Sequence, residues 1–358
     1  MVRLFYVLIF LLPLPLKDQD SLRAGRQVSI LPLPVVFSTP ETGLGFGALT
    51  SGVFNLGTAE DTRSSNIQVL GAYTVNSQII AQINNNIFTK QERYSLFGEI
   101  SYFDFPILYY GIGNDTEEEN EEDLGYEVIT FQQRLLRQIK KSHFVGIQYR
   151  FISLFDIDYN PDPMALTDTI SIRNDDGVYS GLGVSYVQDT RDNVLNARKG
   201  RFLELSATFH STVLGSDANF TRYRIDYRRF WLINEKSVFA SQFLGEFNNG
   251  DVPFRELALM GGDQIMRGYY QGRYRDKNQI AIQSEYRRKL MPWLGFVLFA
   301  ASGEVGSSLD DIDISNFKWT AGGGLRLTVN KKERINIRID YGIGNGTTGL
   351  YFGFAEAF

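Results

Sequence analysis

The sequence predicts an all-β fold, a transmembrane antiparallel β-barrel of about 16 strands. Three observations support it: side chains that alternate between apolar and polar, connections that alternate between short and long, and a composition rich in aromatic residues and glycine. The 358 residues include 27 Phe, 19 Tyr and 34 Gly, which is typical of many half-apolar strands. After residue 16, no apolar run approaches the ~18 residues that a membrane-spanning helix needs.

The alternation has a period of two residues. It is clearest at 334–341, where Ile335, Ile337, Ile339 and Tyr341 alternate with Arg334, Asn336, Arg338 and Asp340. It recurs at 221–227 and 317–329. Since successive side chains of a strand point to opposite faces, one face is apolar and the other ionic. Charges of both signs on one face favour lipid outside and a polar lumen, and a soluble all-β fold is the alternative.

The expected strands follow from this pattern, counted back from Phe358. They are 350–358, 334–344, 318–329, 293–305, 279–290, 236–247, 219–232, 201–212, 178–189, 143–155, 126–140, 92–104, 78–90, 65–76, 43–56 and 30–38. This numbering places short connections on one side of the membrane, at 140–142, 233–236, 291–292 and 330–333. Long ones fall on the other side, at 105–125, 157–177, 248–278 and 306–317. Short periplasmic turns and long external loops are typical of outer-membrane barrels.

The N-terminus resembles a targeting segment. Arg3 precedes an apolar run from Leu4 to Leu16, which Pro13 and Pro15 interrupt. The run is too short to span a membrane and has the size of a signal-peptide core. Residues 1–17 are therefore the expected signal peptide, with no cleavage site assigned, and 28–358 the expected single barrel domain. An apolar first helix of a soluble domain is the alternative, which the prolines disfavour.

Composition excludes several classes of function. The chain has no Cys, so disulfides and thiolate metal sites are excluded. Its net charge of −5 argues against a nucleic-acid partner. The only histidines, His143 and His210, have no nucleophile motif beside them, so we expect neither an enzyme nor a metal or other cofactor. The acidic run 115–123 is interpreted as a solvated external loop, with divalent-cation binding at the lipopolysaccharide surface as the alternative.

Two motifs carry a family resemblance. Met266-Arg267-Gly268-Tyr269 resembles the Val-Arg-Gly-Phe loop motif of the BamA/TamA-type superfamily of outer-membrane barrels, also called the bacterial surface antigen family. Asp189-Thr190-Arg191-Asp192, followed by Gly200, resembles the periplasmic turn of that family, with Asn196 and Ala197 where Pro and Thr are usual. The terminal Phe358 also agrees, as a barrel-end signal expected in the interfacial aromatic girdle. The resemblance extends over residues 180–358.

This resemblance implies that the loop folds back into the lumen. Arg267 would then meet carboxylates on the inner wall, and the motif positions imply Glu285 and Glu304 as its partners. Parity along the strand independently places Glu285 on the polar face. Gly268 would allow a tight backbone path, Tyr269 would pack against the wall, and the glycines at 322–324 would leave room for the loop. The contact is either a stabilising lock alone or part of substrate handling.

The resemblance also implies a location and a function. The chain would be a multi-pass outer-membrane protein that assists insertion or translocation of protein or lipid. Its partners would be outer-membrane lipid, lipopolysaccharide, and a periplasmic partner or client protein. Family members usually carry periplasmic POTRA domains, and the short segment before the first strand predicts a barrel-only member. The alternatives are a plugged passive pore for small solutes, with 248–278 as the constriction, and an outer-membrane enzyme.

The first strand is unusual because Pro32 and Pro34 lie within it. Each proline removes a backbone donor from a β-ladder. The seam between the first and last strands would then be weakly bonded and able to open sideways, as the resemblance to the family implies. Alternatively, these prolines belong to a lead-in, and the strand begins at Val35.

Overall fold

The computed structural model describes residues 29–39, 43–58, 62–159, 176–331 and 333–358. The expected signal peptide lies outside these residues, as does most of the long connection expected at 157–177. Within the described residues, no helix is long and apolar enough to cross a membrane.

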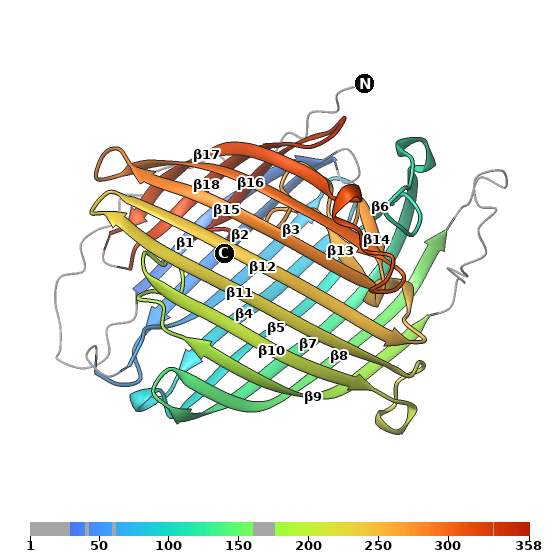
Figure 1. The fold of residues 1–358 in the computed structure, drawn as a ribbon, viewed down its shortest axis with the longest axis horizontal. Helices are drawn as coiled ribbons and strands as arrows, with labels where there is room; N and C mark the ends of the chain where they lie inside the picture. The colour runs from blue at the N-terminus through green and yellow to red at the C-terminus, as the bar shows by residue number, and fades with distance from the viewer. Residues whose placement is uncertain (1–28, 40–42, 59–61, 160–175, 332) are drawn as a thin grey trace.

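The regular secondary structure of the described chain is almost entirely antiparallel strand (Figure 1). The strands are β1 (Ser29–Thr39), β2 (Gly43–Phe54), β3 (Ser65–Thr74), β4 (Ile79–Phe88), β5 (Tyr94–Asp104), β6 (Ile107–Tyr109), β7 (Glu122–Lys140), β8 (His143–Tyr159), β9 (Gly177–Asp189), β10 (Gly200–His210), β11 (Phe220–Asn234), β12 (Ser237–Gly250), β13 (Ala258–Met260), β14 (Tyr274–Asp276), β15 (Asn278–Lys289), β16 (Leu294–Gly306), β17 (Lys318–Asn330), β18 (Ile335–Ile343) and β19 (Thr348–Phe354). Five single-turn 3-10 helices lie in the connections: η1 (Lys90–Glu92), η2 (Glu118–Asn120), η3 (Thr212–Leu214), η4 (Phe254–Glu256) and η5 (Ile314–Asn316).

The main sheet is a meander in which each long strand pairs with the next one along the chain. β6 continues the line of β5 on the same partner, β7. The seventeen strands of this sheet therefore occupy sixteen strand positions, as expected. The sheet curls into a barrel, with β10–β12 and β15–β18 in front of β3–β8 in Figure 1. β13 and β14 form a separate small hairpin.

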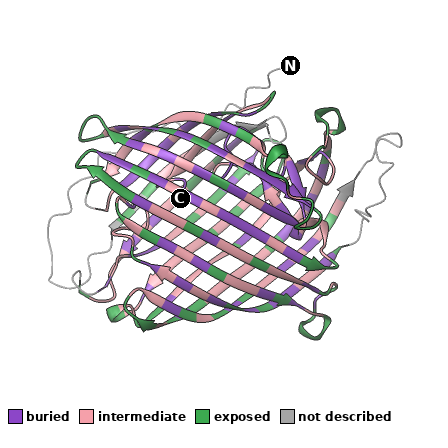
Figure 2. Ribbon diagram, viewed as in Figure 1, coloured by how far each residue is buried: buried purple, intermediate pink, exposed green. Residues whose placement is uncertain are grey.

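The two faces of the sheet differ as the alternation predicts (Figure 2). Large apolar side chains are exposed on the outside, among them Tyr227, Ile282, Leu298, Trp319, Leu325 and Tyr341. Their sequence neighbours point inward and are buried, among them Asp226, Gln283, Thr320, Arg326 and Asp340. A soluble sandwich would bury its apolar face. An exposed apolar outside around a buried ionic inside is what a bilayer requires.

The connections also separate as expected. In Figure 1 the turns after β11 and β17 lie at the left end, whereas β6, β13 and β14 lie at the right end, within the long connections. Short and long connections therefore mark opposite rims. In the acidic run, residues 117–120 are exposed. No group of three or more His, Asp or Glu in the described residues could hold a metal ion.

The C-terminus departs from the prediction. β19 ends at Phe354, and Ala355 has φ of 67°. The backbone therefore leaves the sheet, and residues 355–358 turn into the lumen. Phe358 is buried beside Phe230, Ala240 and Ala357, so its expected place in the interfacial girdle is wrong.

We expect a charge on the outer face to destabilise the barrel. Leu298 lies mid-way along β16 and is 56% exposed. In lipid, Leu298→Arg should lower the free energy of unfolding by about 2–4 kcal/mol, the cost of a cation near the bilayer midplane. The measurement is a urea titration in phospholipid vesicles, followed by tryptophan fluorescence.

Leu309→Arg is the matched control, because Leu309 is 60% exposed but lies in the long connection after β16. Equal unfolding midpoints for the two variants would contradict a lipid-facing outer surface.

Candidate functional site

The connection between β12 and β15, residues 251–277, occupies the lumen. Its β13–β14 hairpin and the segment between them pack against the inner wall. The buried cluster contains Met260, Ile265, Met266, Tyr269 and Tyr274 from this connection with Leu244, Ala281, Ala301 and Val305 from the wall. The connection is thus a structural part of the barrel interior, as the resemblance implied.

Arg267 anchors this lumen loop, and its side chain is fully buried. Nη1 donates to Asp340 Oδ2 of β18 at 2.6 Å, and Nη2 donates to Glu285 Oε1 of β15. The guanidinium carbon also lies 3.7 Å from the centre of the Phe299 ring. A planar guanidinium can serve two carboxylates at once, which a lysine ammonium cannot do in the same geometry. The expected contact with Glu285 is therefore present.

Both carboxylates have further cationic partners. Glu285 Oε2 accepts from Arg287 Nε at 2.7 Å. Asp340 accepts from Arg326 and from Arg338 Nη1 at 3.2 Å. Burying a lone charge is costly, whereas an alternating network satisfies the charges and donors together. The loop arginine is one member of an ionic cluster on β15, β17 and β18.

The expected partnership of Glu304 with Arg267 is wrong. Glu304 Oε2 accepts from the Asp313 amide at 2.8 Å, and Oε1 accepts from Asn114 Nδ2 at 3.3 Å. The residue lies near the long-connection end of β16, beside η5, and holds external loops together. Asp340 is the second carboxylate partner of Arg267 instead. It was visible in the sequence as a polar residue of the 334–341 alternation, but nothing there showed how deep it lies.

The lumen loop has a second anchor that nothing in the sequence predicted. Glu256 of η4 is fully buried, and Arg150 of β8 donates to both of its oxygens at 2.9 Å. The loop is thereby pinned on the β8 wall as well as on β15 and β18. Only the tertiary structure brings these residues together, since they are 106 positions apart.

Gly268 and Tyr269 behave as expected. Gly268 has φ of 125°, and a side chain there would collide with the backbone of Ile343 at 2.8 Å. Tyr269 is buried, and its hydroxyl accepts from the Asn345 amide at 3.1 Å. The Tyr351 hydroxyl accepts from the Gly268 amide and donates to the Tyr269 carbonyl, each at 2.9 Å. The motif therefore docks against β18 and β19 through backbone contacts that require glycine.

The glycines at 322–324 make room for different groups than expected. A Cβ on Gly322 would meet the Phe299 ring, and one on Gly324 would meet the Asp340 carboxylate. They accommodate the residues that hold Arg267. Close approach of the loop backbone itself depends on Gly342, whose Cβ would meet the Arg267 carbonyl.

The connection between β9 and β10, which carries the second motif, extends to other short connections. Asp189 accepts from Arg191 Nη2 at 2.9 Å and from Arg63 Nη1 at 2.6 Å, and Arg63 belongs to the β2–β3 connection. Asp192 accepts from Arg334 Nη1 at 2.6 Å, in the β17–β18 turn. Gly200, with φ of 105°, begins β10 where a Cβ would meet the Thr190 carbonyl. Sequence reasoning found the motif but not its distant partners.

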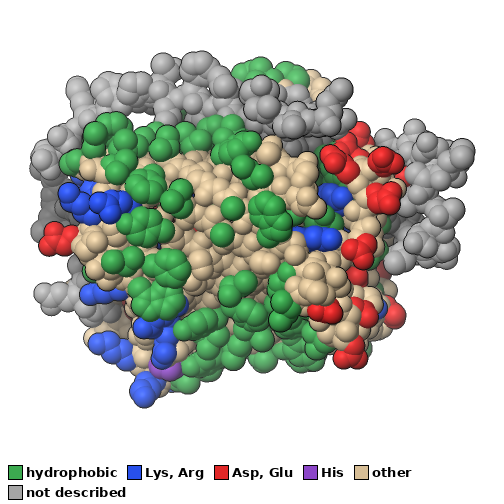
Figure 3. Space-filling model, turned by 45° about the horizontal axis from the view of Figure 1, so that its top comes forward, with side chains coloured by type: hydrophobic (Ala, Val, Ile, Leu, Met, Phe, Trp, Pro, Cys, Tyr) green, Lys and Arg blue, Asp and Glu red, His purple; other side chains and the backbone are tan. Residues whose placement is uncertain are grey.

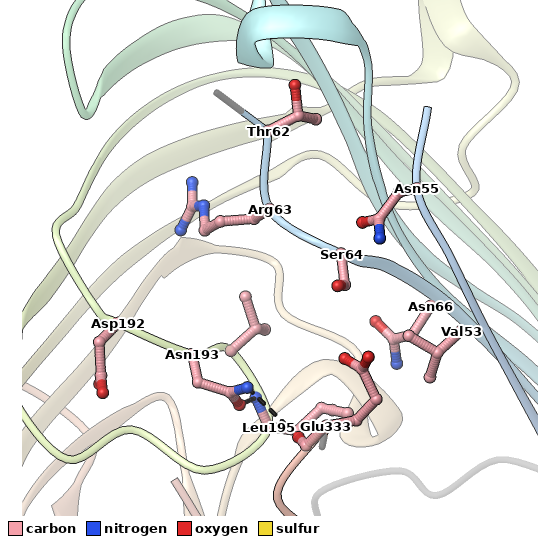
Figure 4. Close-up of a pocket in the computed structure, with 11 residues that line it drawn as sticks. Val53, Asn55, Thr62, Arg63, Ser64, Asn66, Asp192, Asn193, Leu195 and Glu333 are labelled. Carbon is pink, nitrogen blue, oxygen red and sulfur yellow. Dashed lines mark hydrogen bonds between the residues drawn. The ribbon is translucent and has the colours of Figure 1, made fainter. Parts of the chain in front are cut away.

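These three connections enclose a polar pocket of about 200 Å³ (Figure 4). Arg63 and Ser64 lie on one side, Asp192 and Asn193 on another, and Asn193 Nδ2 donates to the Glu333 carbonyl at 3.3 Å. The Glu356 amide donates to the Leu195 carbonyl at 3.2 Å. The β9–β10 connection, which we call the crossing turn (residues 190–199), therefore joins elements from both ends of the sheet.

Removing the loop anchor should destabilise the barrel. Arg267→Ala leaves Glu285 and Asp340 buried without their shared cation. We expect a loss of about 3 kcal/mol, the low end for a broken buried ion pair, because each carboxylate keeps another arginine. Arg267→Lys should be intermediate. Urea titration in vesicles measures both, and limited proteolysis should cut 251–277 faster.

Arg255→Ala is the control, because Arg255 lies in the same loop but has no carboxylate within 4 Å among the described residues. If it destabilises as much as Arg267→Ala, the ion pairs are not the anchor.

The crossing turn should be sensitive to acid. Burial opposes ionisation of Asp192, but hydrogen bonds from Arg334 and from the amides of Arg198 and Lys199 outweigh it and hold the pKa of this carboxyl below its usual 3.8. Its contribution to stability is present above that value and lost as pH falls through the lower folded-state pKa. Wild type should unfold at higher urea than Asp192→Asn at pH 7, and the two should converge below pH 3.8. A gap that widens on acidification would contradict this.

Comparisons with known proteins agree with this architecture. No curated protein sequence matches the chain. Among solved structures, BamA from Haemophilus ducreyi lacking POTRA domains 1–3 superposes with a TM-score of 0.56 at 12% identity, over 98% of this chain and 75% of that one. CdiB from Escherichia coli gives 0.58 at 12% identity, over 97% and 64%. CdiB from Acinetobacter baumannii gives 0.53 at 14%, over 88% and 56%.

At these identities the structural likeness shows the fold, and the chain spans less than two thirds of either CdiB chain. The family follows from the sequence. The profile of the Omp85 superfamily domain matches residues 66–358, which extends the resemblance well beyond the 180–358 expected from the motifs. The chain belongs to the Omp85 superfamily of outer-membrane β-barrel proteins.

Proposed function

We propose that this barrel assists the insertion or translocation of protein or lipid at the outer membrane by opening between β1 and β19. The observation that carries the proposal is the strand pairing at this seam. All other long strands of the sheet have a ladder on both edges, whereas in the described residues β1 pairs only with β2, and β19 only with β18.

The prolines of β1 reinforce the weakness of the seam. β1 begins at Ser29, so Pro32 and Pro34 lie within the strand, opposite Thr50 and Ala48 of β2. In an antiparallel strand, alternate residues direct their amides to the same neighbour. Since the ladder with β2 is continuous, these two positions are those whose amide would point away from β2. The edge of β1 that faces the seam therefore lacks two donors.

The walls beside the seam also differ from the rest of the barrel. β1, β2, β3, β4 and β19 contain no charged residue. β15, β17 and β18 carry the buried ionic cluster around Arg267. Moving a strand that holds buried ion pairs would expose or separate charges, whereas uncharged strands can shift without that cost. This contrast supports a design in which β1–β4 move against an anchored β15–β18 wall.

The lumen loop supports that anchored wall. Arg267 and Glu256 hold the loop at opposite sides of the lumen. Under this proposal the partners are outer-membrane lipid, lipopolysaccharide and a periplasmic partner or client. The filled lumen also suits the second candidate, a plugged passive pore, so the experiment must separate the two.

Site-specific photo-crosslinking in cells tests the proposal. A photoreactive residue replaces Val35 on β1 or Phe352 on β19. We expect adducts with newly exported outer-membrane proteins or with lipid at both positions. Leu182 on β9 is the control, because it is 47% exposed on a strand with a ladder on each edge.

A plugged pore gives the opposite results. Adducts would then be no more frequent at Val35 and Phe352 than at Leu182. Arg267→Ala would raise the conductance of the purified barrel in planar bilayers, because loosening the loop opens the lumen.

A further inference from the structure

A basic cleft lies at the short-connection rim, separate from the lumen loop. It encloses about 220 Å³. It forms where the crossing turn, the β11–β12 turn, the β15–β16 turn and the β17–β18 turn meet. Its charged lining residues are Arg198, Glu235, Lys236, Arg287, Arg288, Lys289, Arg326, Lys331, Arg334 and Glu356.

The charge of this lining is strongly unbalanced, with eight Lys or Arg against two Glu. Arg287, Arg326 and Arg334 have carboxylate partners. Among the described residues, the other five cations have no carboxylate within 4 Å. Figure 3 shows the wider setting: Lys and Arg gather at the left end of the barrel and Asp and Glu at the right. The positive potentials of these neighbouring cations add up in the cleft, so the cleft attracts an anion.

A buried donor in the cleft has no partner. Arg287 is 7% exposed. Its Nε donates to Glu285 at 2.7 Å and its Nη2 donates to the Phe358 carbonyl at 2.9 Å. Nη1 is buried without any hydrogen-bond partner in the described residues. A buried guanidinium nitrogen without an acceptor is unfavourable, so Arg287 adds to the cleft lining a cation whose hydrogen-bonding capacity is not fully used.

Part of the cleft lining is apolar. Leu294 and Phe296 of β16 line it. Met291 and Trp293, in the adjoining β15–β16 turn, are 50% and 52% exposed. Tryptophan at the end of a lipid-facing strand is typical of the membrane–water interface. The cleft thus places a cluster of cations directly beside the apolar belt of the barrel.

We propose that this cleft binds the phosphate headgroup of an anionic phospholipid from the adjacent leaflet. Arginine and lysine bind phosphate oxygens through charge-assisted hydrogen bonds. The acyl chains would lie along Trp293 and Phe296. In single-chain outer-membrane barrels the short turns face the periplasm, so the lipid belongs to the periplasmic leaflet. This assignment stands independently of the proposed function.

The test uses the full-length barrel in nanodiscs that contain equal amounts of phosphatidylglycerol and phosphatidylcholine. Native mass spectrometry measures which lipids remain bound. Wild type should retain phosphatidylglycerol preferentially. Lys236→Ala with Lys289→Ala should reduce that preference about tenfold, the effect of losing charge-assisted contacts. Both lysines are exposed, Lys236 in the β11–β12 turn and Lys289 at the end of β15, so the variant keeps the fold, which heat-modifiability on gels verifies.

Lys140→Ala with Lys141→Ala is the matched control. It removes the same charge from exposed residues of the same rim, at the β7–β8 turn. An equal loss of preference in both variants would overturn the site, because it would reflect the net charge of the rim. Displacement of the lipid by millimolar inorganic phosphate would overturn the lipid assignment, leaving a site for free phosphate. Retained lipid under phosphate, lost only in the cleft variant, supports the proposal.

Discussion

The buried guanidinium of Arg267, held between Glu285 and Asp340, is the contact on which the interior depends. A charge cannot stay inside a barrel without a partner of opposite sign, because its desolvation cost is too large. Each carboxylate in turn needs the arginines beside it. One loop side chain therefore links β15 to β18 and holds its segment of the lumen loop against both strands. Gly342 and Gly324 lie next to this cluster, and a side chain at either position would collide with it.

The same physics divides the barrel into unequal parts. Strands with buried ion pairs are costly to move. The loop ties several of them together through Arg267, and through Glu256, which pairs with Arg150 on β8. Strands β1–β4 and β19 carry only neutral side chains, and the seam lies between them. In the proposed opening, the placement of charge would decide which strands move, and the prolines of β1 add to the contrast because they provide no donors at the free edge.

The C-terminal tail connects these parts to the short-connection rim. Instead of ending in the sheet, it turns inward, where Glu356 accepts from Arg326 at 2.7 Å and the Phe358 carbonyl accepts from Arg287. The Glu356 amide also reaches the crossing turn. One short segment therefore contacts the ionic cluster, the basic cleft and the crossing turn.

The sequence alone determined the barrel, its sixteen strand positions and the inward and outward faces, which follow from a period of two residues, a local property of the chain. The contact of Arg267 with Glu285 was implied by the resemblance of the loop motif to a known family. The sequence did not determine that Asp340 rather than Glu304 completes the pair, that Glu256 reaches Arg150, or that Phe358 leaves the sheet. Parity gives the face of a residue but not its depth along the barrel or its neighbour across the lumen. Only the packing of the curled sheet around the loop decides those contacts.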